Sequence, residues 1–315
     1  MPSSRPWPPW RSGKGRPLAD PRVTVVIITR NRRGELARTL ERTAALPESP
    51  ATVVLDNGST DGTAAMARRR FPGVETVALP ANHGAVARNI GVALSTTPYV
   101  AFCDDDTWWD PGSLTEAADA LDRHPRLAVV TARIIVEPEG REDPICAELA
   151  ASPLPVPPGQ PGPALLSFLA GASVVRRRAF LAAGGFSPRI FIGGEEELLG
   201  VDLVEAGWHM AYLPRAAIHH HASDARDSHA RRRVGIRNTF FYTWMRRPAA
   251  DALRRSGAQL RLLPADRVSV AGCAEALAGV AGVARDRVTV SGRVAAQMRQ
   301  LDPSQLGSPA RRYVS

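Results

Sequence analysis

The sequence predicts an α/β fold in which a mainly parallel sheet is flanked by helices. Continuous apolar, β-branched runs at residues 23–29, 51–55, 74–78 and 99–103 alternate with segments of helical spacing. Such runs are typical of strands buried on both faces, and their alternation with helices indicates a parallel sheet. Polar or acidic residues follow each run, where parallel strands present their carboxyl ends. We therefore expect a ligand site along that edge of the sheet.

The segments between these strands have the spacing of helices. Residues 31–46 and 85–94 carry apolar side chains on one helical face. Ser59 or Thr60 can cap a helix that ends near residue 70. Strand and helix are therefore expected to alternate along the whole N-terminal part of the chain.

The remainder of the chain has a less regular pattern. Its expected helices are residues 111–122, 195–206 and 227–245, and its expected strands are residues 128–136, 165–175 and 210–213. The many prolines of residues 137–163 predict a loop. We expect a flexible basic tail at residues 1–21, an α/β domain at residues 22–247, and a helical C-terminal extension at residues 248–315.

Composition and charge exclude several classes of protein. The 315-residue chain has a net charge of +9, carried almost entirely by arginine because Lys14 is the sole lysine. No nucleic-acid-binding motif accompanies this charge, so we expect no nucleic acid partner. Cys103, Cys146 and Cys273 are far apart in the sequence, which argues against a zinc site or a disulfide framework.

The expected location of the protein is the cytoplasm. The N-terminus lacks the apolar core of a signal peptide, and no stretch reaches the ~20 apolar residues of a transmembrane helix. The basic tail at residues 1–21 leaves association with the inner face of the membrane as an open alternative.

The acidic run Asp104-Asp105-Asp106 is the first candidate site. It follows the apolar run that ends at Cys103, and carboxylate clusters of this kind bind divalent metals through hard oxygen ligands. A nucleotide diphosphate needs such an ion to neutralise its charge. The alternatives are a solvated acidic loop and a helix cap, and the position at a strand end favours metal binding.

Two further segments supply candidate ligand-binding groups. Asp56 ends the second strand, where its carboxylate can accept hydrogen bonds from a base or a ribose, whereas Asp61 is better explained as a helix cap. Gly84 allows close backbone approach at the start of the next helix, and Arg88 lies one turn into it. The alternative for Arg88 is an ordinary surface arginine.

Two clusters in the second half of the chain carry titratable groups. Glu195-Glu196-Glu197 begins a helix, where acids suit the helix dipole, but one of them could also serve as a general base. His219-His220-His221 follows an expected strand, and a neutral imidazole could complete a metal shell or contact a leaving diphosphate. A partly buried loop is the alternative for any one of the histidines.

These segments together resemble the family 2 glycosyltransferases, which have the GT-A fold. The matching pieces, in chain order, are VVIITRNR, VVLDNGSTDGT, NHGAVARNIG, VAFCDDDTWWD, GASVVRRRAFLAAGGF, FIGGEEELLGVDL and HHH. They extend over about residues 22–240, and their order and spacing make the resemblance specific. The resemblance implies an inverting, metal-dependent sugar transfer from a nucleotide sugar donor to an acceptor that is a glycan, a lipid-linked sugar or a small molecule.

The resemblance also implies roles for individual residues. The implied donor-binding residues are Thr29, Arg30, Asn31, Asp56, Arg88, Asp104 and Asp105, with Asp56 and Arg88 on the base and Asp104 at the ribose. Asp106 would hold Mn²⁺ or Mg²⁺, with His220 as a further ligand. The base of the family is usually the second acid of a Glu-Asp pair, which here reads Glu195-Glu196. We therefore expect Glu196 to be the base, with Glu195 as the alternative. Arg237-Asn238 resembles a late Arg-Asn pair of the family.

Other functions remain as alternatives. The replacement of the usual aspartate by Glu196 leaves open a nucleotide-sugar-binding protein without catalysis. A nucleotidyltransferase would show a glycine-rich phosphate loop after the first strand, and residues 28–35 lack one. A dinucleotide dehydrogenase is disfavoured because no GxGxxG follows residue 29.

Overall fold

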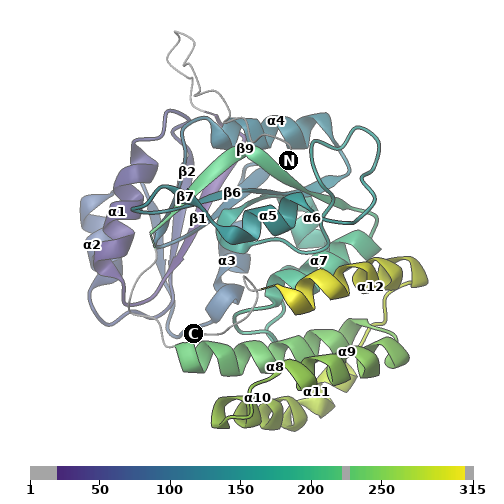
Figure 1. Cartoon of the computed structure of the whole chain (residues 1–315). Helices are drawn as coiled ribbons and strands as arrows, with labels where there is room; N and C mark the ends of the chain where they lie inside the picture. Colours follow the sequence, from purple (N-terminus) through teal and green to yellow (C-terminus); the bar gives the residue numbers. More distant parts are fainter. Residues whose placement is uncertain (1–19, 222–227, 309–315) are drawn as a thin grey trace.

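The computed structural model describes residues 20–221 and 228–308. A central sheet is flanked by helices, and a layer of helices without strands lies below it in the view of Figure 1. The strands are β1 Val23–Thr29, β2 Ala51–Asp56, β3 Glu75–Ala78, β4 Tyr99–Asp104, β5 Thr107–Trp109, β6 Leu127–Val136, β7 Arg141–Glu142, β8 Ser173–Arg176 and β9 His209–His220.

Twelve α-helices occur in these described residues. They are α1 Arg33–Ala44, α2 Thr63–Arg70, α3 Ala87–Leu94, α4 Ser113–Arg123, α5 Pro144–Ala150, α6 Arg177–Ala182, α7 Glu195–Glu205, α8 Ser228–Arg246, α9 Ala249–Leu262, α10 Arg267–Ala278, α11 Val280–Arg285 and α12 Gly292–Gly307. The helices α1, α2 and α3 connect the strands β1 to β4, so the predicted alternation is confirmed. Of the tail predicted at residues 1–21, only residues 20 and 21 are described.

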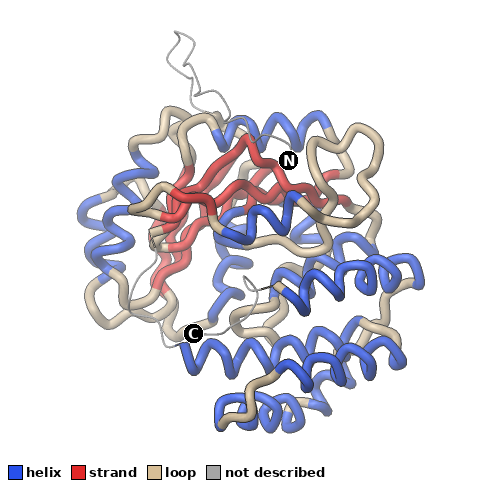
Figure 2. The backbone as a smooth tube through the Cα atoms, viewed as in Figure 1, coloured by secondary structure: helices blue, strands red, loops and turns tan. Residues whose placement is uncertain are grey.

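The sheet is parallel in its first half and mixed in its second. Its order is β3-β2-β1-β4-β8-β6-β9-β5, with β7 paired to β6. The strands β3, β2, β1 and β4 run parallel, while β8 is antiparallel to both β4 and β6. Figure 2 shows the strands, in red, gathered in one sheet. The side chains of β1 and β4 are almost wholly buried, as their continuous apolar runs predicted. The expected α/β fold is therefore present, with an antiparallel component.

Several predicted boundaries in the second half were wrong. Residues 137–163 are not one loop, because Asp143 caps the short helix α5 through the Ile145 amide. The apolar run 165–175 is mostly irregular buried chain, and only its end belongs to β8. The run is apolar because it is buried, and a short apolar run of this kind looks the same in sequence whether it is a strand or an irregular buried segment.

Two local predictions near the site also changed. The helix α2 is not capped by Ser59 or Thr60, because both residues bond Asn31 instead. The Asn31 backbone amide donates to Ser59 Oγ at 2.8 Å, and the Asn31 side-chain oxygen accepts from the Thr60 amide at 2.8 Å. Asp61 accepts from the Thr63 amide at 3.0 Å, but the residue at the cap position of α2 is Gly62. The strand expected at residues 210–213 is longer, and β9 runs to His220.

The C-terminal helices pack closely on α8. A Cβ built on Gly272 would lie 2.9 Å from the Arg233 carbonyl oxygen, and one on Gly279 would lie 2.2 Å from Phe241 Cζ, so α10 approaches α8 where it lacks side chains. The buried Arg247 guanidinium donates to both carboxylate oxygens of Asp302 on α12, at 3.0 and 2.6 Å. A search of the described helices for one long and apolar enough to cross a bilayer finds none.

Candidate active site

The site lies at the carboxyl ends of the parallel strands. The register pairs Thr29 with Asp56 and Ile28 with Asp104, so the ends of β1, β2 and β4 lie level with one another. The acidic run predicted from the sequence therefore lies beside the end of the first strand. This is the edge at which open α/β sheets bind ligands.

Asp105 is a buried carboxylate held by two donors. Thr29 Oγ1 donates to its Oδ2 at 2.9 Å, and Arg32 Nη1 donates to its Oδ1 at 3.0 Å. Burial raises the pKa of Asp105 to about 7, although the nearby positive charge of Arg32 opposes the rise. Asp105 and Thr29 thus form the buried floor of the site.

Asp106 lies between a guanidinium and an imidazole. Arg32 Nη1 is 3.0 Å from its Oδ2, and His220 Nε2 is 3.8 Å from its Oδ1. A carboxylate oxygen suits Mn²⁺ or Mg²⁺, whereas an imidazole nitrogen suits a transition-metal ion better than Mg²⁺. The described residues contain no ready group of three such side chains. The donor set therefore fits an ion that takes its remaining ligands from a bound diphosphate and water.

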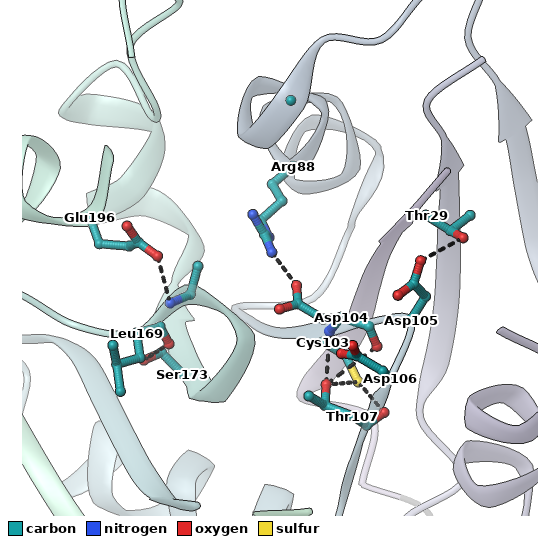
Figure 3. Close-up of polar contacts among 12 residues, drawn as sticks. Thr29, Arg88, Cys103, Asp104, Asp105, Asp106, Thr107, Leu169, Ser173 and Glu196 are labelled. Carbon is teal, nitrogen blue, oxygen red and sulfur yellow. Dashed lines mark hydrogen bonds and ion pairs between the residues drawn. The ribbon is translucent and has the colours of Figure 1, made fainter. Parts of the chain in front are cut away.

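Asp104 faces away from this pair toward Arg88. The carboxylate of Asp104 is 41% exposed and accepts a hydrogen bond from Arg88 Nη2. The guanidinium of Arg88 is itself buried, and its Nε has no hydrogen-bond partner among the described residues. Figure 3 shows this arginine side chain between Asp104 and Glu196. The arginine is therefore no ordinary surface residue.

Glu195 and Glu196 begin α7 directly after Gly194, whose φ of +98° marks a left-handed turn. Glu196 Oε1 accepts from the Ala170 amide at 3.3 Å, and Glu195 is 3% exposed with no partner for its Oε2 among the described residues. Burial raises the pKa of both carboxyls, and the positive charge of Arg88 partly opposes this. A raised pKa makes each carboxylate a stronger proton acceptor.

A short turn connects the acidic run with the glutamates. The Ala170 amide contacts Glu196 Oε1, and a Cβ built on the neighbouring Gly171 would lie 2.6 Å from Asp104 Oδ2. The turn Ala170–Ala172 therefore has Asp104 on one side and Glu196 on the other. This brings together residues that are more than ninety positions apart, since 196 − 104 is 92.

The loop before the glutamates is fixed by two contacts. Gly84 adopts a φ of +59°, and the amide of Ala85 donates to the Phe191 carbonyl at 2.8 Å. Asn238, which is fully buried on α8, donates to the carbonyls of Ile192 and Gly193 at 2.9 and 2.7 Å. These contacts determine the position of the first turn of α7.

The remaining predicted donor residues surround the end of β1. Asp56 is buried and accepts from the Ser59 amide at 2.9 Å. Asn31 has a φ of +51° and both it and Arg30 are exposed. Arg30 and Asn31 are therefore accessible to a ligand bound at the carboxyl end of β1.

The three histidines face different environments. His220 faces Asp106, whereas His219 bonds Glu137 Oε1 at 2.7 Å and lies parallel to the Trp108 ring at 5.5 Å. Adjacent strand residues point to opposite faces, which explains the division. Hydrogen bonding to Asp110 and then to Glu137 raises the pKa of His219. A cavity of about 530 Å³ borders His219 and His221 on that other face.

Sequence reasoning missed Arg32, the turn Ala170–Ala172 and the role of Asn238. Arg32 lies in a segment of several arginines, and its acidic partners are more than seventy residues away, so no local pattern identifies it. Asn238 was noted only as part of a late Arg-Asn pair. Its buried amide would have been detectable as a polar residue on the inner face of an otherwise amphipathic helix.

Comparisons with known proteins identify the family of this chain. A family model described as glycosyl transferase family 2 matches residues 24–181. N-acetylglucosaminyl-diphospho-decaprenol L-rhamnosyltransferase of Mycobacterium tuberculosis is 30% identical over 276 residues, which cover 74% of this chain and 90% of the relative. The pre-mycofactocin glycosyltransferase of the same organism is 31% identical over 67% of this chain and 45% of its own length.

Solved structures show the same fold at lower identity. The mannosyltransferase PcManGT from Pyrobaculum calidifontis, in complex with GDP-Man and Mn²⁺, has a TM-score of 0.59 and 20% identity, covering 97% of this chain and 86% of its own. GalNAc-T7 with UDP, GalNAc and Mn²⁺ has a TM-score of 0.58 and 14% identity, covering 80% and 53%. The expected GT-A fold is thereby confirmed. With half of the chain matched by the family model and a relative 30% identical over most of both chains, the protein is a glycosyltransferase that belongs to glycosyl transferase family 2.

Proposed function

We propose that the protein transfers a sugar from a nucleoside diphosphate sugar to an acceptor hydroxyl, with a divalent metal and with inversion at the anomeric carbon. The observation that carries this proposal is the turn Ala170–Ala172, which has Asp104 on one side and Glu196 on the other. The carboxylate proposed to bind the donor and the carboxylate proposed to deprotonate the acceptor thus lie on either side of one turn. PcManGT and GalNAc-T7, the structural neighbours, were solved with GDP-Man or UDP and with Mn²⁺.

The strand ends would bind the donor. Thr29, Arg30, Asn31 and Asp56 would line the nucleotide pocket around the end of β1. Asp104 has an exposed carboxylate that could accept hydrogen bonds from ribose hydroxyls, while Arg88 fixes its orientation. Asp105, buried beneath them, would support this floor of the pocket.

Asp106 and His220 would hold Mn²⁺ or Mg²⁺. When bound, the ion would neutralise the charge of the diphosphate and so favour its departure. Arg32 donates a hydrogen bond to one oxygen of the Asp106 carboxylate. If Asp106 exchanged that bond for a bound metal ion, the second bond of Arg32, to Asp105, would keep the guanidinium in place. The buried position of Asp106 limits the orientations of its carboxylate.

Glu196 would act as the general base, with Glu195 as the alternative. Its carboxylate would take the proton from the acceptor hydroxyl, and that oxygen would attack the anomeric carbon opposite the diphosphate. The carbon–oxygen bond to the diphosphate would break as the new glycosidic bond forms, which inverts the configuration. The buried environment that raises the pKa of Glu196 suits this role.

The acceptor would be a lipid-linked sugar. The rhamnosyltransferase relative is named for an N-acetylglucosaminyl-diphospho-decaprenol acceptor. In this chain Phe191 and Ile192, which precede the glutamates, are 37% and 41% exposed. Exposed apolar side chains beside a base would suit the apolar part of such an acceptor. Such an acceptor would place the enzyme at the inner face of the membrane.

Nucleotide binding tests the proposal. Calorimetry with UDP, GDP and dTDP, with and without Mn²⁺, should find one nucleotide that binds in a metal-dependent way. In Asp106→Asn that metal dependence should disappear. Absence of binding by all three nucleotides in both conditions would exclude the donor site. Binding without turnover on any acceptor would instead favour a protein that binds the nucleotide sugar and does not transfer it.

A further inference from the structure

The exposed surface of helices α9 to α11 has an unusual composition. Between residues 249 and 285, every exposed residue is alanine, leucine, valine, proline or arginine. These residues, which we call the apolar–basic face, are Ala249, Ala250, Leu253, Arg254, Leu260, Arg261, Leu262, Pro264, Ala265, Arg267, Val270, Ala274, Leu277, Ala278, Val280, Ala281, Ala284 and Arg285. An ordinary exposed helical surface carries both signs of charge and neutral polar groups.

Several of the apolar side chains on this face are largely exposed to solvent. The exposed fractions are 63% for Leu253, 69% for Val270 and 73% for Leu277. Val270, Ala274 and Leu277 are spaced as neighbours along one side of α10. Between them lies the half-buried Cys273, so the side is apolar along most of its length.

The acidic residues beside this face are less exposed than its arginines. Asp251 is buried and bonds Arg299, and Glu275 pairs with Arg233 of α8 at 3.1 Å. Arg254 and Arg285 pair with Asp251 at 2.8 Å and with Asp286 at 3.2 Å, but their side chains are 58% and 74% exposed against 10% and 32% for the two acids. The outer surface is therefore basic as well as apolar.

The packing of α10 fixes the direction of its apolar side. Gly272, Ala276 and Gly279 face α8, where a Cβ on either glycine would collide with it. Val270 and Leu277 lie on the other side of the helix and point away from α8. In Figure 1 the helices α9, α10 and α11 form the layer farthest from the sheet.

We infer that the apolar–basic face docks onto the surface of an anionic lipid bilayer. Leucine and valine side chains would enter the boundary between headgroups and acyl chains, and the arginines would contact anionic headgroups. A nucleic acid would match the charge but would leave the leucines and valines in water. A second copy paired through this face would set arginine against arginine, because Asp251, Asp266 and Asp286 already pair with arginines of their own chain.

The docking face and the proposed base belong to one packed unit. The helix α10 packs on α8, and Asn238 of α8 holds the turn before Glu195 through two hydrogen bonds. Docking would therefore hold the first turn of α7, which carries the proposed base, close to a bilayer. This would suit the lipid-linked acceptor, but the inference depends on the composition of the surface and not on the proposed reaction.

Vesicle flotation of the full chain tests the inference. The protein should float with vesicles of mixed phosphatidylcholine and phosphatidylglycerol, and much less with phosphatidylcholine alone. Val270→Gln/Leu277→Gln should lower the partition coefficient by about tenfold or more, because two apolar contacts are lost. Arg267→Gln/Arg285→Gln should weaken binding to the anionic vesicles by about tenfold, and added salt should have the same direction of effect.

A matched control separates this face from exposed apolar residues elsewhere. Val156→Gln/Leu181→Gln changes two other exposed apolar side chains and should bind vesicles as the wild type does. Failure of the wild type to bind anionic vesicles would overturn the inference, as would unchanged binding by both face variants. A dimer in light scattering that the face variants abolish would identify a second copy as the occupant and would also overturn it. None of these readouts requires sugar transfer.

Discussion

Glu196 combines a partly buried position with a raised pKa, and this determines when it can accept a proton. Burial raises its pKa above the ordinary value of 4.5, while the positive charge of Arg88 limits the rise. Glu195 is more deeply buried and is repelled by Glu196. Of the two, Glu196 is the one whose carboxylate reaches the turn Ala170–Ala172.

Replacement of Glu196 by glutamine tests its role. Glu196→Gln keeps the size and the contact with the Ala170 amide but cannot take a proton, so kcat should fall about 10²- to 10⁴-fold with nucleotide binding retained. In the wild type, kcat should rise with pH through a pKa above that of an ordinary glutamate, because the deprotonated form is the active one. Steady-state kinetics and calorimetry give both quantities.

Glu197→Gln is the matched control on the same helical turn. It should keep most of the activity, since the charge of Glu197 acts on Tyr242 and Arg255, outside the proposed site. Full activity in Glu196→Gln would reject the assignment, and a loss confined to Glu195→Gln would transfer the role to the alternative.

The sequence indicated the carboxylates but not their partners. Asp104 to Asp106 and Glu195 to Glu197 are adjacent in the chain, so they form patterns that can be read directly. Arg32 contacts Asp105 and Asp106 only because β1 and β4 pair, and no local sequence pattern predicts that contact. Which of three consecutive histidines faces Asp106 likewise depends on the course of β9, which was expected to end before them.

At the scale of the elements, the site depends on a close contact between the loop at Gly84 and the loop at Phe191. A Cβ on Gly84 would lie 2.1 Å from the Phe191 carbonyl oxygen, and its φ of +59° disfavours any side chain. Gly84→Ala should therefore separate the two loops, lower the free energy of unfolding by about 1–3 kcal/mol and reduce kcat. Thermal unfolding and kinetics measure these effects.

Gly73→Ala provides the comparison for this change. Gly73 has nothing within 4 Å of a built Cβ and no positive φ, so the variant should stay within about 0.5 kcal/mol of the wild type. Equal stability and activity in Gly84→Ala and Gly73→Ala would show that the loop contact does not position the glutamates.

The elements differ in how far sequence could predict them. The strands β1, β2 and β4 are buried on both faces, so their apolar runs have clear limits that the structure reproduces closely. The strand β5 has three residues and follows an acidic turn, and its pairing with β9 is a long-range contact. A strand this short has no periodicity of its own, which is why it was missed.

At the scale of the whole molecule, a buried ion pair joins the α/β part to the last helix. The side chain of Arg247 is 2% exposed and that of Asp302 is 16% exposed. Asp302→Asn leaves Arg247, and Arg255 which also pairs with Asp302 at 3.3 Å, without their carboxylate, so the free energy of unfolding should fall by on the order of 3 kcal/mol. Chemical denaturation at constant pH measures the loss.

Two further variants make this result specific. Asp286→Asn removes an exposed partner of Arg189 and should have a much smaller effect. Arg247→Met/Asp302→Leu removes both charges and should recover part of the lost stability. If Asp302→Asn is no less stable than Asp286→Asn, the pair does not anchor α12. The predicted division at residues 247 and 248 stays a prediction, and this pair spans it.

The packing of α10 also has a consequence for labelling chemistry. Cys103 and Cys146 are buried, whereas Cys273 is partly accessible and lies between Val270 and Leu277. Burial raises the pKa of its thiol, so a maleimide dye should be attached at mildly alkaline pH. The unaltered chain thus carries its own attachment point for a polarity-sensitive fluorophore, whose emission would report when α10 leaves water.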